Sequence, residues 1–196
     1  MRISEYRIIK QPLSDRLDHS QFDKLDIENY FAWFKEMKDD RVSYFTEFVF
    51  GKHLSEVSDT HLFGLQYLLK DSLKARSKTS QEISDEINML PEHLKRIHEI
   101  ENYVLIEPSY SIIFDIGLFW AEFLKAKFSS LDWGIEARPN MAQYGELCLN
   151  ESGRKVFCPI WIVHILARQV FEGSTSEDRL QKLHSYWLNI FAKEQS

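Results

Sequence analysis

The sequence predicts an α+β protein that is mostly helical, a single helical domain with a small antiparallel β-hairpin packed on a central long helix. Seven glycines and five prolines in 196 residues are too few for the repeated tight turns of a sandwich or barrel. Apolar residues recur at steps of three and four along most of the chain, as in amphipathic helices. No linker or repeat divides the sequence, so we expect residues 1–196 to form one globular domain.

The N-terminal part predicts a short strand and then helices. Residues 6–9 have the composition of a short strand. Residues 22–50 carry apolar side chains at helical spacing, and Asp39 and Asp40 interrupt the pattern, so we expect two helices there. A further helix is expected over residues 61–74, capped at its start by Asp59-Thr60.

The middle of the chain contains the strongest apolar pattern. Residues 80–90 and 91–103 predict two shorter helices, because Pro91 suits a first helical turn. After Pro108, large apolar side chains occur on more than one face of the next expected helix, including Ile112, Phe119 and Phe123. A helix of this kind is packed on several sides, so we expect it to be the central helix of the fold.

The C-terminal part predicts the hairpin and two helices. Residues 131–137 and 145–150 are short segments bounded by turn residues, typical of an antiparallel strand pair. Cys158-Pro159 opens a helix that Gly173 ends. Overlapping capping-box candidates at residues 174–178 precede the last helix, which carries an apolar stripe.

Charge and composition exclude several classes of function. The chain has 24 Lys plus Arg and 30 Asp plus Glu, a net charge of −6, which disfavours nucleic-acid binding. The longest stretch without charge, residues 156–167, is shorter than the roughly 20 residues of a membrane-spanning helix. Residues 1–11 have no apolar secretion signal, and Cys148 and Cys158 form no C-x-x-C motif, so we expect a cytoplasmic protein.

Enzyme and metal motifs are absent from the sequence. It has no phosphate-binding glycine loop, no nucleophile elbow and no H-E-x-x-H, so we expect a non-enzymatic protein with no cofactor. His93 and His98 lie five positions apart and would not share a helix face, so no metal site is predicted. His164 and His184 lie on apolar helix faces and Cys158 has apolar neighbours, so structural roles are expected for all three.

Asp115 and Glu122 interrupt the central helix with two carboxylates on nearly the same face. One interpretation is a small-molecule pocket near Asp115 and Glu122, in an enzyme or a sensor, because buried carboxylates are costly unless something favours them. The other is that each carboxylate pairs with a cation or a backbone N–H of the same chain.

The same stretch carries a family resemblance. The residues are Asp115-x-Gly117-x-Phe119-x-x-Glu122, then Leu131-x-Trp133, a helix beginning at Pro159 and a last helix bearing Trp187. Over about residues 108–192 the chain resembles a group of small bacterial proteins proposed to be immunity partners of polymorphic toxins. The resemblance implies a cytoplasmic binding protein without catalytic residues.

An acidic, aromatic segment is the predicted partner site. Residues 15–40 hold eight acidic and four basic side chains, a net charge of −4, interleaved with aromatic residues. We expect Asp23, Asp26 and Glu28 to form an acidic rim and Trp33 an aromatic anchor for a basic protein partner, such as a toxin domain. The alternative is an amphipathic helix with a solvated acidic face.

Overall fold

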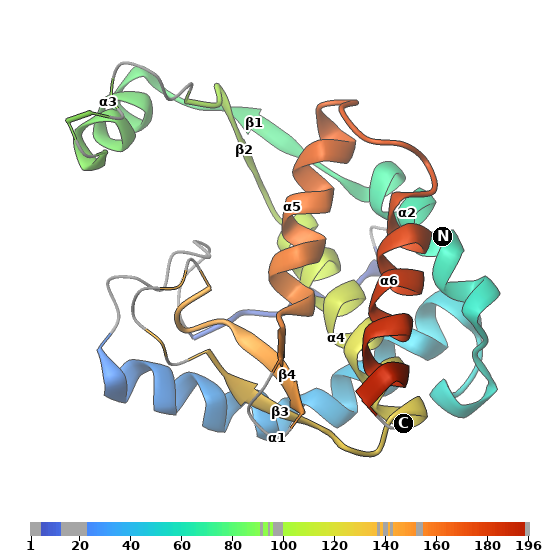
Figure 1. Cartoon of the computed structure of the whole chain (residues 1–196). Coiled ribbons are helices and arrows are strands. Elements are labelled where there is room, and N and C mark those ends of the chain that lie inside the picture. The colour runs from blue at the N-terminus through green and yellow to red at the C-terminus, as the bar shows by residue number, and fades with distance from the viewer. Residues whose placement is uncertain are drawn as a thin grey trace.

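The computed structural model describes residues 5–12, 23–90, 92–93, 95, 100–136, 138, 141, 143–151 and 155–194. Its helices are α1 (Lys24–Phe50), α2 (Asp59–Ser72), α3 (Ser80–Met89), α4 (Ser109–Lys127), α5 (Pro159–Phe171) and α6 (Arg179–Glu194), with a 3-10 turn at Leu54–Glu56. Its strands are β1 (Ala75–Ser77), β2 (Tyr103–Leu105), β3 (Leu131–Ile135), β4 (Leu147–Glu151) and β5 (Lys155–Phe157). The fold is mostly helical with small antiparallel sheets, which confirms the predicted class (Figure 1).

Helix α4 forms the centre of the core, as predicted. It contacts α1, α2, α5 and β3, and side chains on every face of it are buried. Gly117 lets α5 approach closely, because a Cβ at this position would lie 2.6 Å from the Cα atom of Ile160. Only glycine leaves that space, so Gly117 helps to set the crossing of α4 and α5.

Helix α1 is continuous, and the predicted break at Asp39 and Asp40 is wrong. Both aspartates are exposed, so their carboxylates remain in water and cost the helix only about 0.5 kcal/mol each in intrinsic propensity. Phe34, Arg41 and Phe45 are buried on the face that packs toward α4. Burial on both sides of the two aspartates therefore keeps α1 in one piece.

Residues 6–9 form no strand, contrary to the prediction. The Ile9 N–H donates to Ser111 Oγ at 2.9 Å, and the Arg7 N–H donates to the Tyr44 hydroxyl at 2.6 Å. The ring of Tyr6 is buried beside those of Tyr44 and Phe48. Side chains of α1 and α4 thus accept the backbone hydrogen bonds of this segment in place of a neighbouring strand. The strand-like composition of the segment does not reveal these contacts.

Strands β3 and β4 form the predicted hairpin, and β5 adds a third strand in the order β3-β4-β5. Trp133 lies opposite Leu149, and Leu149 lies opposite Phe157, so three buried apolar side chains cross the sheet. Both α1 and α4 contact β3, which places the sheet against the helical core. The third strand was not predicted because it is only three residues long and ends just before Cys158-Pro159.

Strands β1 and β2 pair antiparallel and carry α3 between them, a unit of residues 75–105 that we call the arm. Figure 1 shows the arm leading away from the helical body, with α3 at its end. Helix α3 was predicted. Of the helix predicted over residues 91–103, the described residues are not helical, and residues 91, 94 and 96–99 lie outside the description. Glu92, His93 and Lys95 lie in turns, and Tyr103 belongs to β2. The strand partner of Tyr103 is Ser77, 26 residues earlier and beyond the reach of local periodicity.

Helix α6 begins at Arg179, later than the capping-box candidates indicated. A side chain of another helix accepts a backbone hydrogen bond from its first turn. The buried side chain of Gln66 in α2 accepts a hydrogen bond from the Leu180 N–H at 2.8 Å and donates to the Ser176 carbonyl at 2.7 Å. Helix α5 begins at Pro159, as predicted. None of the described helices combines the length and the apolar character required to cross a bilayer.

Candidate functional site

The acidic residues predicted to bind a partner lie at the start of α1, where two of them have a structural role. Asp23 Oδ1 accepts from the Asp26 N–H at 2.9 Å, and Asp26 Oδ2 accepts from the Asp23 N–H at 3.3 Å, which makes a capping box. Glu28 is exposed and lies 3.5 Å from Lys24, one turn earlier. Asp15 and Asp18 lie outside the described residues. Part of the acidic charge therefore serves to start the helix.

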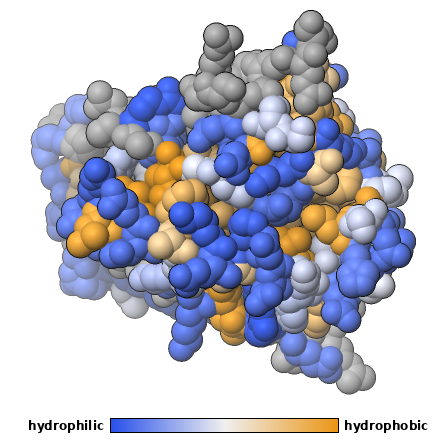
Figure 2. Space-filling model, turned by 90° about the horizontal axis from the view of Figure 1, so that it is seen from below, coloured by the Kyte–Doolittle hydropathy of each residue, from blue (hydrophilic) through white to orange (hydrophobic). Residues whose placement is uncertain are grey.

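Trp33, the predicted aromatic anchor for a partner, is only partly accessible. It is half-buried, stacked on Tyr30 with ring centroids 5.5 Å apart and tilted against Phe114 at 6.1 Å. Because these contacts join α1 to α4, the indole belongs mainly to the core. Figure 2 views the molecule from the side of α1 in Figure 1, and this face is mostly hydrophilic with scattered apolar areas.

Asp115 is bound by two side chains of this chain. Arg41 donates to its carboxylate with Nε at 2.7 Å and a terminal nitrogen at 2.5 Å, and the Tyr6 hydroxyl donates a third bond. Burial raises the pKa of the Asp115 carboxyl and lowers that of Arg41 to about 10. Arg41 remains charged at neutral pH, so the two-pronged contact stabilises the carboxylate form. This arrangement joins the N-terminal segment, α1 and α4.

Glu122 is half-buried and has different partners. It accepts a hydrogen bond from the indole nitrogen of Trp133 at 2.5 Å, and the ammonium group of Lys38 lies 3.9 Å away. The structure therefore does not bring Asp115 and Glu122 together around a shared ligand. Neither carboxylate lines any of the cavities described below.

The buried histidines and cysteines of the body also have partners within the chain. Trp120 donates to Nδ1 of His184 at 3.0 Å, and Nε2 of His184 lies 2.9 Å from Asp59. Burial lowers the pKa of His184, consistent with a neutral ring that donates from Nε2. The Cys148 thiol and burial together raise the pKa of Cys158. Among the described residues, no three His, Cys, Asp or Glu side chains are grouped to hold a metal ion.

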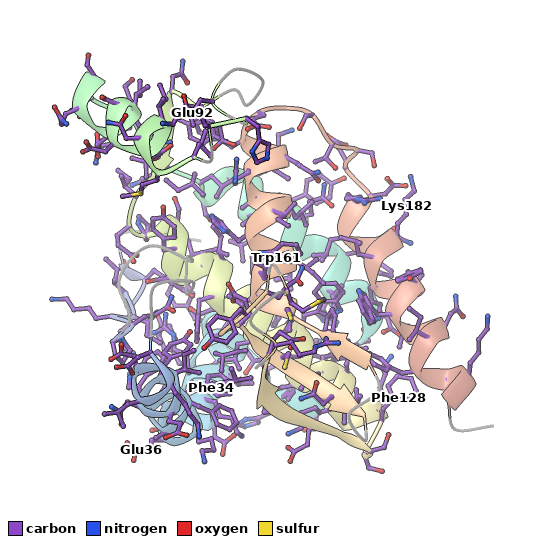
Figure 3. All side chains as sticks on the ribbon, turned by 60° about the vertical axis from the view of Figure 1, so that its left-hand side comes forward. Phe34, Glu36, Glu92, Phe128, Trp161 and Lys182 are labelled. Atoms are coloured by element: carbon purple, nitrogen blue, oxygen red, sulfur yellow. The ribbon has the colours of Figure 1, made fainter. Side chains whose placement is uncertain are left out.

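A cleft of about 600 Å³ lies between the arm and α5, and we call it the arm cleft. Its walls come from α3, from all three residues of β2, and from Tyr110, His164 and Arg168. A much smaller hollow, of about 240 Å³, lies beside Trp33 and Arg41. In Figure 3 the arm lies at the top, beside the label of Glu92, and α5 bears Trp161 near the centre. Sequence reasoning missed the arm cleft altogether.

Acidic groups outnumber basic ones in the arm cleft. Its lining has four carboxylates, those of Glu82, Asp85, Glu86 and Glu101, and two cations, Lys78 and Arg168. Lys78 lies 2.7 Å from Glu86, and Arg168 is ion-paired with Glu101. Arg76, outside the cleft, binds Glu82 at 2.6 Å.

Neutral aromatic side chains complete the lining. The Tyr103 hydroxyl donates to Glu172 at 2.7 Å, and burial raises the pKa of Tyr103. Burial lowers the pKa of His164 to about 4, so its ring is uncharged at neutral pH. The cleft thus combines aromatic walls with an excess of negative charge.

In comparisons with known proteins, no family model matches the chain, and no curated protein or solved structure matches it either. The function therefore has to be argued from the described geometry.

Proposed function

We propose that this chain is a non-enzymatic cytoplasmic protein that works by binding another protein, and that the arm is its main recognition element. The observation that carries the proposal is that α3 has no buried residue. A ten-residue helix gains most of its stability by burying an apolar face, and α3 is instead held out from the body on two short strands (Figure 1).

The apolar residues of α3 support a binding role. Ile83 and Ile87 lie one turn apart, and Ile87 and Met89 are 37% and 64% exposed. Large exposed apolar side chains on a projecting element are typical of interaction sites, and methionine adapts well to a partner surface. The start of α1 presents fewer side chains that are free to bind a partner, because Asp23 and Asp26 form its cap and Trp33 packs against Phe114.

The test is to isolate the partner with the tagged full-length chain, purify it, and measure its binding by calorimetry. Ile87→Ser with Met89→Ser should weaken the affinity at least tenfold, because apolar contacts at an interface centre dominate its energy. Leu25→Ser is the matched control, since Leu25 is 63% exposed on α1. Equal binding by the α3 variant, or recovery of no stoichiometric partner, would contradict the proposal. A loss confined to Leu25→Ser would move the interface to α1.

A narrower form of the proposal makes the partner a toxin domain. It depends on the resemblance of residues 108–192 to immunity proteins, together with the acidic net charge of −6, which suits a basic partner. Where a toxin gene neighbours the coding gene, co-expression of the two should restore growth of a host that the toxin alone arrests. Failure of rescue, with binding to an unrelated protein intact, would exclude the toxin and leave the binding role.

A further inference from the structure

We infer that the outer edge of β2 accepts an extended, lysine- or arginine-bearing segment of the partner as an added strand. The inference rests on the proposed binding function and states how the arm cleft would be used. It starts from the hydrogen-bond pattern of the two-stranded arm.

The register of the arm decides where the backbone groups of β2 point. Beyond the ends of the ladder, Lys78 N–H donates to the Asn102 carbonyl at 2.8 Å, and Ile106 N–H donates to the Lys74 carbonyl at 3.0 Å. In an antiparallel pair such bonds recur at every second residue, so Val104 is the residue of β2 that bonds β1. Tyr103 and Leu105 therefore direct their N–H and C=O groups away from β1. Leu105 is buried, with 4% of its surface exposed, so Tyr103 is the residue of β2 at this edge that an added strand can reach.

These outward groups have no hydrogen-bond partner among the described residues. Unpaired strand edges recruit extended segments of other chains, because the added strand satisfies the row of donors and acceptors. The opposite edge, on β1, is less available, because the Ser77 carbonyl accepts a hydrogen bond from Arg76 at 3.1 Å. The edge of β2 is thus the better template for strand addition.

The arm cleft follows this edge. Side chains of consecutive strand residues point to opposite faces, yet Tyr103, Val104 and Leu105 all line the cleft. The cavity therefore touches β2 along its whole length. Its volume of about 600 Å³ is within the range of a site that encloses a ligand of several residues' bulk.

The lining indicates the chemistry of the incoming segment. Four carboxylates face two cations, and no basic group is bonded to Asp85, which accepts only from Gln81 at 2.8 Å among the described contacts. Tyr103 and Tyr110 supply aromatic faces on which a cationic side chain packs favourably. An extended segment with basic residues at alternate positions can bond the backbone groups of the β2 edge and pair its cations with the carboxylates of the arm cleft.

The experiment uses the full chain and a capped heptapeptide of alternating lysine and valine. Binding should slow amide hydrogen exchange of Tyr103 at least tenfold and leave that of Val104 nearly unchanged, because Val104 is already bonded to β1. Binding without protection of Tyr103, or no binding at millimolar peptide, would overturn strand addition. The same peptide with every backbone nitrogen methylated should bind at least tenfold more weakly, because it cannot donate to the edge.

Matched variants separate charge from backbone pairing. Asp85→Asn should weaken peptide binding several-fold and reduce its salt dependence, whereas Asp40→Asn on α1, also exposed, should do neither. Equal effects of the two variants would contradict recognition of the peptide by the carboxylates of the arm cleft. A concentration-dependent dimer, seen by sedimentation and lost with the peptide, would assign the edge to a second copy and overturn the inference.

The two proposals fail in different ways. Ile87 does not line the cleft, so Ile87→Ser should leave peptide binding unchanged while it weakens binding of the native partner. If the native partner binds through Ile87 and the exchange of Tyr103 does not change, the binding function stands and strand addition falls.

Discussion

The helical body and the arm use similar residues in opposite ways. In the body, charged and polar side chains meet in the interior, as Arg41 does with Asp115 and His184 with Trp120. In the arm, ion pairs such as Arg76–Glu82 lie at the surface, and α3 buries no side chain. Polar side chains of the body already bond one another, so substitutions there should change stability. Groups of the arm are available, so substitutions there should change binding.

The largest effect should come from the buried ion pair. Arg41→Ala removes the guanidinium and leaves the Asp115 carboxylate buried with the Tyr6 hydroxyl alone, so unfolding in urea should show a loss of about 3–5 kcal/mol. Glu28→Gln is the control on the same helix. It breaks an exposed pair with Lys24 and should cost under about 0.5 kcal/mol. Equal losses would mean that breaking the buried pair costs no more stability than breaking the exposed one.

The crossing of α4 and α5 should come next. Gly117→Ala would place a methyl group 2.6 Å from the backbone of Ile160, and such overpacking costs about 1–3 kcal/mol. Gly64→Ala is the matched control in α2, because a Cβ there would meet no atom within 4 Å. That variant should gain about 0.5–1 kcal/mol from helix propensity. Thermal unfolding of both variants measures the difference, and a neutral Gly117→Ala would show that the two helices can separate without cost.

A pH-dependent effect of about 1–2 kcal/mol is expected from Glu146. Burial raises the pKa of its carboxyl to about 8 in the folded chain, against an ordinary value of 4.5. Between these values the native state keeps a proton that the unfolded chain has lost, so stability should fall as the pH rises from 6.5 to 8. His164 acts in the opposite direction and mainly below this window, because stability rises with pH between its folded pKa of about 4 and its ordinary value of 6.5.

The control for this titration is a pair of variants compared by urea unfolding across the same pH range. Glu146→Gln should flatten the pH dependence, and the exposed Glu36→Gln should leave it as in the natural chain. A slope that persists in Glu146→Gln would assign the titration to another group.

The smallest effect on stability is expected in the arm. Ile87→Ser should change the free energy of unfolding by no more than about 0.5 kcal/mol, because the side chain is already exposed. Amides of α3 should exchange with solvent at least about 100-fold faster than those of α4, since α3 has no buried side chains to protect it. Protection of α3 equal to that of α4 would show that the arm folds together with the body.

The sequence pattern was sufficient to predict an element where the residues of that element carry the signal themselves. The apolar side chains around α4, the hairpin of β3 and β4, and Pro159 at the start of α5 were all predicted. In each case the residues that form the element also carry its periodicity, so a single window of sequence contains the information. The interpretation of Asp115 as paired within the chain was open from the sequence, and the contact with Arg41 decided in its favour.

Partners distant in the sequence decided the rest. Asp39 and Asp40 do not break α1 because the buried face continues on both sides of them, and α6 begins where Gln66 of α2 satisfies its first turn. Tyr103 becomes a strand residue only because β1 lies beside it. The sequence by itself determined which residues are apolar and at what period. Only the tertiary structure decided which edges and faces stay uncovered, because burial depends on what lies next to a residue in space.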